Sequence, residues 1–282
     1  MLYHLLYPLK SYWSILNLFQ YITFRSALAA IIALLISFLF GPKVIHMLKF
    51  HHIGEKIRST GPHTHIQKQG TPTMGGVLIL IAVLLPTLLL ANLTSAYIQI
   101  IIFATIWMGL VGFLDDYLKV VKNFEKGLIA RYKLFGQILI SFGISVWIYN
   151  QGNWDGIYTV TSVPFLKNYN LDFGFFYPLV ILFVITGTSN AVNLTDGLDG
   201  LATGLLAIAF TVFGAIAYIT GRVDFSSYLN ILYLPGAGEL TIFTSAMAGA
   251  CLGFLWFNSA PAQVFMGDVG SLSAGAALGT LA

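Results

Sequence analysis

Long, uninterrupted apolar stretches dominate this 282-residue sequence. A helix needs about 20 mostly apolar residues to cross a bilayer. We identify seven stretches as complete spans, and an eighth stops after 14 residues: 26–42, 75–90, 97–114, 134–149, 175–192, 201–220 and 240–257, then 269–282. Because these stretches do not alternate apolar and polar residues, they predict helices rather than barrel strands. The sequence therefore predicts an all-α, polytopic transmembrane helix bundle, a single domain over 1–282, with its eighth span cut short.

The charge content supports this class of protein. Only 9% of the residues are charged, 14 basic and 11 acidic, against about 25% in an ordinary soluble domain. Such a composition excludes a disordered chain, a nucleic-acid binder of the basic-patch type, and a disulfide scaffold, since Cys251 is the one cysteine.

The positions of the basic residues predict the orientation. Loops 43–68 and 115–133 lie on the same side by parity and hold ten of the fourteen lysines and arginines. The positive-inside rule then places them in the cytoplasm and the N-terminus in the periplasm. Residues 1–24 are rich in aromatic side chains and lack a signal-peptide pattern, which favours an interfacial amphipathic helix.

Five aspartates gather at the predicted cytoplasmic ends of the spans: Asp115, Asp116, Asp196, Asp199 and Asp268. Carboxylates at membrane depth are costly, so they indicate function by default. Each of them alone could equally be a helix cap or a solvated loop residue. Their collection on one face, from three different loops, favours a shared site.

Two acidic motifs carry most of this hypothesis. Asp115 and Asp116 are adjacent and repel one another unless a divalent metal or a lysine, with Lys119 nearest in sequence, offsets their charge. Three further polar residues recur every third position, so a helical turn would place them roughly on one face: Asn193, Asp196 and Asp199.

The remaining candidates suit a phosphate and a base. Asp268 lies between glycines and can present its carboxylate to a phosphate–metal pair. Phe265 could stack on a planar base or be a membrane-interface aromatic. In loop 61–76, Lys68 and threonine hydroxyls such as that of Thr73 could cradle an anion. The nearby histidines lack zinc-site spacing, so the inventory favours magnesium.

Several segments, in order along the chain, together resemble the bacterial phospho-N-acetylmuramoyl-pentapeptide-transferases: 69–76, 112–117, 127–133, 190–200 and 253–271. The Asn-Leu-Thr-Asp-Gly-Leu-Asp-Gly version of the fourth segment points to this branch of the wider polyprenyl-phosphate sugar-1-phosphate transferases.

The resemblance implies ten spanning helices in the bacterial inner membrane, a cytoplasm-facing site and a homodimer. It implies Mg²⁺-dependent transfer of phospho-MurNAc-pentapeptide from UDP-MurNAc-pentapeptide to undecaprenyl phosphate, with release of UMP. Asp268 would bind the metal, while Asp115 and Asp116 would position or deprotonate the lipid phosphate. The other residues carried over would line the site, with Phe265 on uracil: Lys68, Thr73, Lys119, Lys133, Asn193, Asp196, Asp199 and Asn258.

One departure concerns the C-terminus. The family has a late cytoplasmic loop with a His-His-His run, which this sequence lacks together with the rest of helix eight and helices nine and ten. We therefore expect a truncated chain that is inactive by itself. Two alternative functions stay open, a sister transferase that uses UDP-GlcNAc and a cation-coupled transporter.

Overall fold

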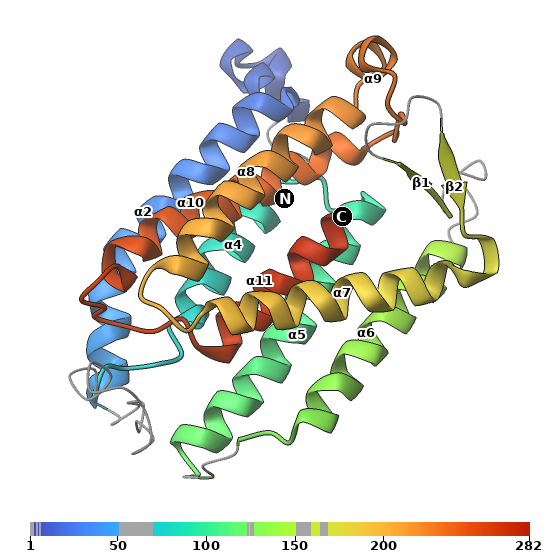
Figure 1. Cartoon of the computed structure of the whole chain (residues 1–282). Coiled ribbons are helices and arrows are strands. Elements are labelled where there is room, and N and C mark those ends of the chain that lie inside the picture. The colour runs from blue at the N-terminus through green and yellow to red at the C-terminus, as the bar shows by residue number, and fades with distance from the viewer. Residues whose placement is uncertain are drawn as a thin grey trace.

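The computed structural model describes residues 3, 5, 7–50, 70–122, 124, 127–150, 159–163 and 169–282. In this part of the chain, six helical segments are long and apolar enough to cross a membrane. They contain α2 (Ile22–Phe50), α5 (Ala96–Val120), α6 (Ala130–Asn150), α7 (Tyr177–Thr195), α8 (Leu201–Thr220) and α10 (Leu240–Asn258). The prediction of an all-α polytopic membrane protein is confirmed (Figure 1).

Two further apolar helices are shorter. α4 (Gly76–Leu90) and α11 (Gly267–Leu281) have 15 residues each, or about 22 Å at the rise of an α-helix. The sequence had counted 75–90 as a complete span. The observed bounds differ from this stretch by one residue, but 15 residues fall short of the length of a complete span. The amides of Gly75 and Gly76 donate to the carbonyls of Phe265 (2.9 Å) and Met266 (2.7 Å), which connects the start of the helix to the loop before α11.

The N-terminal segment also differs from its prediction. Between residues 7 and 20 the structure has two 3₁₀ helices, η1 (Tyr7–Ser11) and η2 (Ser14–Gln20), where the sequence predicted an amphipathic α-helix. They are separate because Trp13 has extended backbone angles, with φ −136° and ψ 107°. Tyr12 and Trp13 are both exposed.

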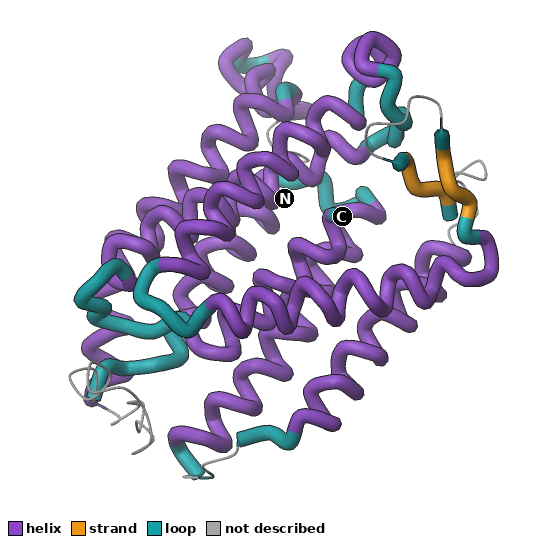
Figure 2. The backbone as a smooth tube through the Cα atoms, viewed as in Figure 1, coloured by secondary structure: helices purple, strands orange, loops and turns teal. Residues whose placement is uncertain are grey.

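The predicted outer loops contain short elements that no sequence motif had marked. Antiparallel strands β1 (Val160–Ser162) and β2 (Asn170–Asp172) pair with Thr161 opposite Leu171 and lead into the 3₁₀ helix η3 (Gly174–Phe176). This hairpin is the β-structure among the described residues (Figure 2). The other loop contains α9 (Val223–Leu229) and η4 (Ala237–Glu239).

α11 lies in the interior of the bundle, packed mainly between α5 and α7 and also against α4 (Figure 1). Small residues permit this close packing, as they do in many membrane bundles. A Cβ atom on Gly76 of α4 would lie 2.1 Å from the Gly270 nitrogen of α11, so the two backbones touch. Nearly every residue of α11 after Asp268 is buried.

At the end of the bundle where α2 begins, a buried ion pair links three helices. Arg25 of α2 donates to both carboxylate oxygens of Glu239, at 2.9 and 2.6 Å, and to the Leu90 carbonyl at 3.1 Å. The Asn92 amide donates to the same carboxylate at 3.0 Å. The pair thus connects α2, the end of α4 and the start of α10.

Candidate active site

Three carboxylates from two helices meet at the opposite end of the bundle. Asp115 and Asp116 lie near the end of α5, and Asp268 is in the first turn of α11. Their ligand oxygens all lie within 4.8 Å of one another. Asp115 is fully buried and Asp116 is 3% exposed. The predicted meeting of these residues, from loops about 150 positions apart, is therefore found in the structure.

Glycines allow α5 and α11 to approach this closely. A Cβ atom on Gly112 would lie 2.2 Å from the Asp268 carbonyl oxygen. Gly267 has φ +73°, a conformation that other residues rarely adopt, and a Cβ there would lie 2.7 Å from Asp116 Oδ2. The Val269 amide donates to that same oxygen at 3.0 Å. These contacts fix the backbone of Asp268 against the end of α5.

Two lysines neutralise part of this negative charge. Lys119 Nζ lies 3.1 Å from Asp268 Oδ2 and also contacts Asp115 Oδ2. Lys133 Nζ, from the first turn of α6, lies 3.1 Å from Asp115 Oδ2 and also contacts Asp268 Oδ2. The lysine side chains are 37% and 19% exposed, respectively, so the cluster opens on their side.

Neutral groups orient the other carboxylate oxygens. Asn193, near the end of α7, donates through Nδ2 to Asp268 Oδ1 and to Ser271 Oγ, both at 2.9 Å. The Leu128 amide donates to Asp115 Oδ1 at 2.6 Å. Sequence reasoning missed Ser271 and the Leu128 amide. Their only local signals were the positions next to the Asp268 motif and to Gly127, whose φ is +56°.

The donor set fits a hard divalent cation. Carboxylate oxygens are the ligands that such ions prefer. Three carboxylates converge here, the Leu128 amide and the Asn193 side chain orient two of them, and one side of the cluster faces solvent. Asp268 is the best placed of the three to hold a cation that also meets a substrate, since it is 14% exposed and its partners are fully buried or nearly so.

The 193–200 segment is not a continuous helix. α7 ends at Thr195, so Asn193 is the one member of the predicted helical face that lies in the helix. Asp196 follows the helix end, and Asp199 lies in a turn where it accepts a hydrogen bond from the Ala262 amide at 3.2 Å. The one-face prediction is wrong because Gly197 and Gly200, with φ +75° at Gly200, permit the turn.

Asn258 lies deeper than a surface-binding residue would. It is 2% exposed, and its Oδ1 accepts hydrogen bonds from the Gly200 amide (3.2 Å) and the Thr203 hydroxyl (2.8 Å). Its Nδ2 donates to the Val264 carbonyl at 3.0 Å. Asn258 thus connects the turn at 196–200 to the loop before α11.

The segment before α4 supports the same loop. The Phe265 amide donates to the Pro72 carbonyl at 2.8 Å, and the Phe265 side chain is partly exposed. Thr73 is buried, and its hydroxyl oxygen would lie 3.0 Å from a Cβ placed on Gly267. Lys68, which the sequence placed in the site, lies outside the described residues.

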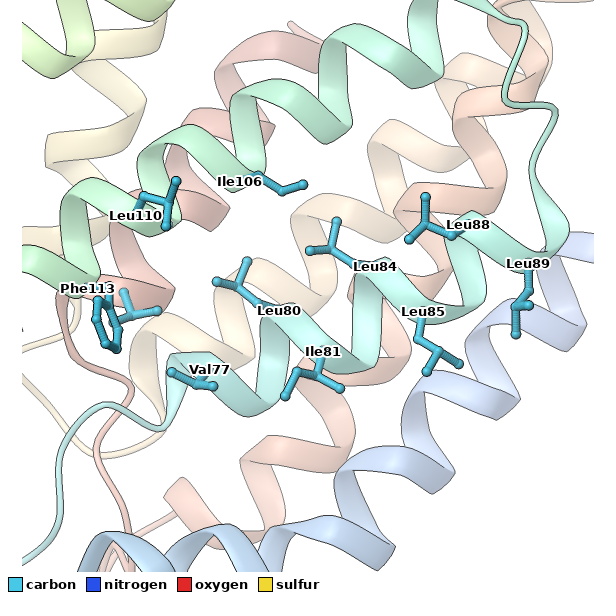
Figure 3. Close-up of a pocket in the computed structure, with 12 residues that line it drawn as sticks. Val77, Leu80, Ile81, Leu84, Leu85, Leu88, Leu89, Ile106, Leu110 and Phe113 are labelled. Carbon is cyan, nitrogen blue, oxygen red and sulfur yellow. The ribbon is translucent and has the colours of Figure 1, made fainter. Parts of the chain in front are cut away.

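A separate apolar groove of about 620 Å³ lies between α4 and α5 (Figure 3). Its wall on α5 includes Ile106, Leu110 and Phe113. At 100° per residue these side chains point away from Asp115 and Lys119 on the same helix. The groove suits hydrocarbon chains, and its lining includes Val269, the residue that follows Asp268.

Comparison with known proteins agrees with a membrane-embedded transferase. Residues 98–282 match the family model of glycosyl transferase family 4, so the chain belongs to that class of membrane transferases. Residues 68–80 match signature 1 of the phospho-N-acetylmuramoyl-pentapeptide-transferases. The enzymes of that name from Thermodesulfovibrio yellowstonii and Rickettsia montanensis are 51% and 50% identical over 282 residues, which are all of this chain and 78% of each relative. The chain belongs to the phospho-N-acetylmuramoyl-pentapeptide-transferase family.

Proposed function

We propose that this protein transfers phospho-N-acetylmuramoyl-pentapeptide from UDP-MurNAc-pentapeptide to undecaprenyl phosphate, forming lipid I and UMP. The observation that carries the proposal is the cluster of three carboxylates and two lysines at one end of a membrane helix bundle. A nucleotide substrate from water and a lipid phosphate from the bilayer can meet only near such an end. The identity to named relatives supports the same reaction.

A bound Mg²⁺, held by Asp268 with Asp115 and Asp116 nearby, would supply positive charge to the diphosphate of the donor. Lys119 and Lys133 add two donors on the open side of the cluster, where they can bind phosphate oxygens. Asn193 holds the Asp268 carboxylate in one orientation through its 2.9 Å hydrogen bond.

The acceptor needs little help to become a nucleophile. A phosphate monoester has a second pKa of about 6, so it is mostly a dianion at neutral pH. We therefore favour direct attack by the lipid phosphate, with Asp115 assisting through the two lysines that it holds beside the site, over a covalent aspartyl-phosphate. A phosphorylated aspartate trapped by rapid quench would contradict this mechanism.

The loops that Asn258 connects are the proposed donor site. Phe265 would stack on uracil, because its backbone is fixed by Pro72 while its side chain stays partly exposed. Asp196 and Asp199 lie on the adjoining turn, and Lys68 and Thr73 belong to the segment that precedes α4. Asn258 would act by positioning these loops.

The site would face the cytoplasm of the bacterial inner membrane, with the N-terminus in the periplasm and the protein as a homodimer. The excess of lysine and arginine in loops 43–68 and 115–133 supports this orientation. Cysteine labelling tests it: a cysteine replacing Lys122 should react only with reagent in the cytoplasm, and one replacing Ser227 only with reagent outside.

The decisive assay is Mg²⁺-dependent release of UMP from UDP-MurNAc-pentapeptide in the presence of undecaprenyl phosphate, carried out on the full-length protein in detergent. Asp268→Asn should abolish release, while Asp224→Asn, an exposed carboxylate paired with Arg222 in a far loop, should not. Activity with UDP-GlcNAc alone would instead identify the sister enzyme. Absence of UMP exchange with both nucleotides would favour a transporter, although a transporter should place its acids near the midplane.

A further inference from the structure

Lys119 and Lys133 form a closed ring with two carboxylate oxygens. Each ammonium contacts both Asp115 Oδ2 and Asp268 Oδ2, so positive and negative groups alternate around four atoms. The two longer contacts, Lys119 to Asp268 and Lys133 to Asp115, are both 3.1 Å. Neither lysine is dedicated to one carboxylate.

The ring occupies the very oxygens that a cation would need. Asp115 Oδ1, Asp268 Oδ1 and Asp116 Oδ2 accept hydrogen bonds from the Leu128 amide, Asn193 and the Val269 amide, respectively. Two of these donors are backbone amides and the third is the partly buried side chain of Asn193. Asp115 Oδ2 is buried and has no hydrogen bond among the described residues, so the two ammonium groups are what neutralise it.

A divalent cation at these oxygens would lie within a few ångströms of both ammonium groups. Like charges at that separation repel strongly where burial lowers the effective dielectric constant. The lysines therefore have to turn away when the cation binds. Both have somewhere to go, because their side chains are 37% and 19% exposed on the open side of the cluster.

We propose that Lys119 and Lys133 are placeholder cations, which occupy the carboxylates until a divalent metal arrives and then move to the oxygens of the acceptor's phosphate. Metal and lipid phosphate then bind cooperatively. The metal neutralises the carboxylates and so frees the two ammonium groups, which in turn neutralise the bound phosphate. The inference rests on the proposed function and adds to it a defined exchange of partners.

The exchange makes a prediction for metal binding that is independent of turnover. Mn²⁺ binding is measured by the loss of the free-ion electron paramagnetic resonance signal, with and without undecaprenyl phosphate. In Lys119→Gln and Lys133→Gln, Mn²⁺ should bind several-fold more tightly without lipid. The tightening produced by lipid phosphate should fall from about tenfold towards none.

Lys122→Gln is the matched control, because it removes the same charge from an exposed position three residues beyond Lys119. It should leave both affinities near the wild-type values. An equal change in this variant would show long-range electrostatics instead of exchange and would overturn the proposal. So would unchanged lipid-free affinity in the two ring variants.

A measurement on the unaltered protein covers the case in which a ring variant fails to fold. The reactivity of each lysine towards reductive methylation is followed by mass spectrometry. Mn²⁺ alone should raise the labelling of Lys119 and Lys133, and added undecaprenyl phosphate should lower it again, with Lys122 unchanged. Constant labelling of the two ring lysines would overturn the proposal.

Asp268→Asn separates this inference from the proposed function. If that variant binds Mn²⁺ as the wild type does, the metal site assigned to Asp268 is wrong and the exchange fails with it, whereas the transfer reaction is tested separately by UMP release. If Asp268→Asn abolishes Mn²⁺ binding while the lysine variants and the labelling behave like the controls, only the exchange is overturned.

Discussion

Replacing Gly112 by alanine should disable the site without touching a charged group. The added Cβ would lie 2.2 Å from the Asp268 carbonyl oxygen and 2.7 Å from the Val269 nitrogen. Both are backbone atoms at the start of α11, so no side chain can rotate to relieve the overlap. Either α5 or the backbone of Asp268 has to move.

The size of the movement follows from these distances. Ordinary van der Waals contacts of a Cβ begin at 3.4 Å, so the gap must widen by about 1 Å. The Asp268 carboxylate would then leave the lysine ring and the other carboxylates. A misplacement of about 1 Å can cost about a hundredfold in rate, and we expect a loss of UMP release of that order.

Two other glycines provide a graded control. A Cβ on Gly109, one turn earlier in α5, would approach the flexible end of Leu80 at 2.8 Å and make an ordinary contact with the Ser273 Cβ at 3.6 Å, and one on Gly204 of α8 would meet nothing within 4 Å. Gly109→Ala should lower activity slightly, and Gly204→Ala should not lower it. Each glycine-to-alanine change favours the helix by about 1 kcal/mol in intrinsic propensity. A fall in the thermal unfolding temperature would therefore show that the added methyl group disturbs packing by more than this gain.

Wild-type activity in Gly112→Ala would refute the reasoning. It would mean that the contact between α5 and α11 does not determine where Asp268 lies. Equal losses in all three variants would refute it too, because open space around Gly204 offers no steric cause.

Further outcomes follow from the other contacts. Asn193→Ala removes the 2.9 Å hydrogen bond that orients Asp268 Oδ1, together with the one to Ser271 Oγ, and should weaken Mn²⁺ binding about 10- to 100-fold, as loss of an outer-shell partner does elsewhere; Asn190→Ala, one turn earlier, is the control. Chelation by EDTA should abolish UMP release and Mg²⁺ should restore it, whereas full activity in the chelator would argue against a metal requirement. Arg25→Met should destabilise the protein by about 3–5 kcal/mol in chemical unfolding, because it leaves Glu239 mostly buried and unpaired. Arg222→Met, which breaks an exposed pair, should be near neutral, and equal destabilisation by both would contradict the role given to burial.

Much of the fold followed from the sequence, because membrane helices depend on long apolar runs that are visible without tertiary information. The convergence of Asp115, Asp116 and Asp268 also followed, because counting the spans is enough to place all three at the same side of the membrane. The bounds of α4 followed to within one residue. The backbone pairing at its start did not follow, because Gly75 and Gly76 bind residues 190 positions later.

Details of the site were harder to predict for the same reason. The spacing of Asn193, Asp196 and Asp199 suggested a helix, but local turn geometry at the glycines ended it at Thr195. Lys119 was predicted as the nearest cation to the aspartate pair in sequence. The sharing of its two carboxylate partners with Lys133 depends on how α6 packs, which no local pattern encodes.

The interior position of α11 has a consequence for biosynthesis. Its sequence has four glycines and two serines in 15 residues. A helix of this composition has only a weak tendency to partition into the hydrocarbon core by itself. It also emerges from the ribosome after α4, α5 and α7, between which it packs. These three helices must therefore remain in the membrane without their central partner until α11 arrives and brings Asp268 to the two aspartates of α5. Chains whose synthesis has stopped before α11 carry no assembled carboxylate cluster.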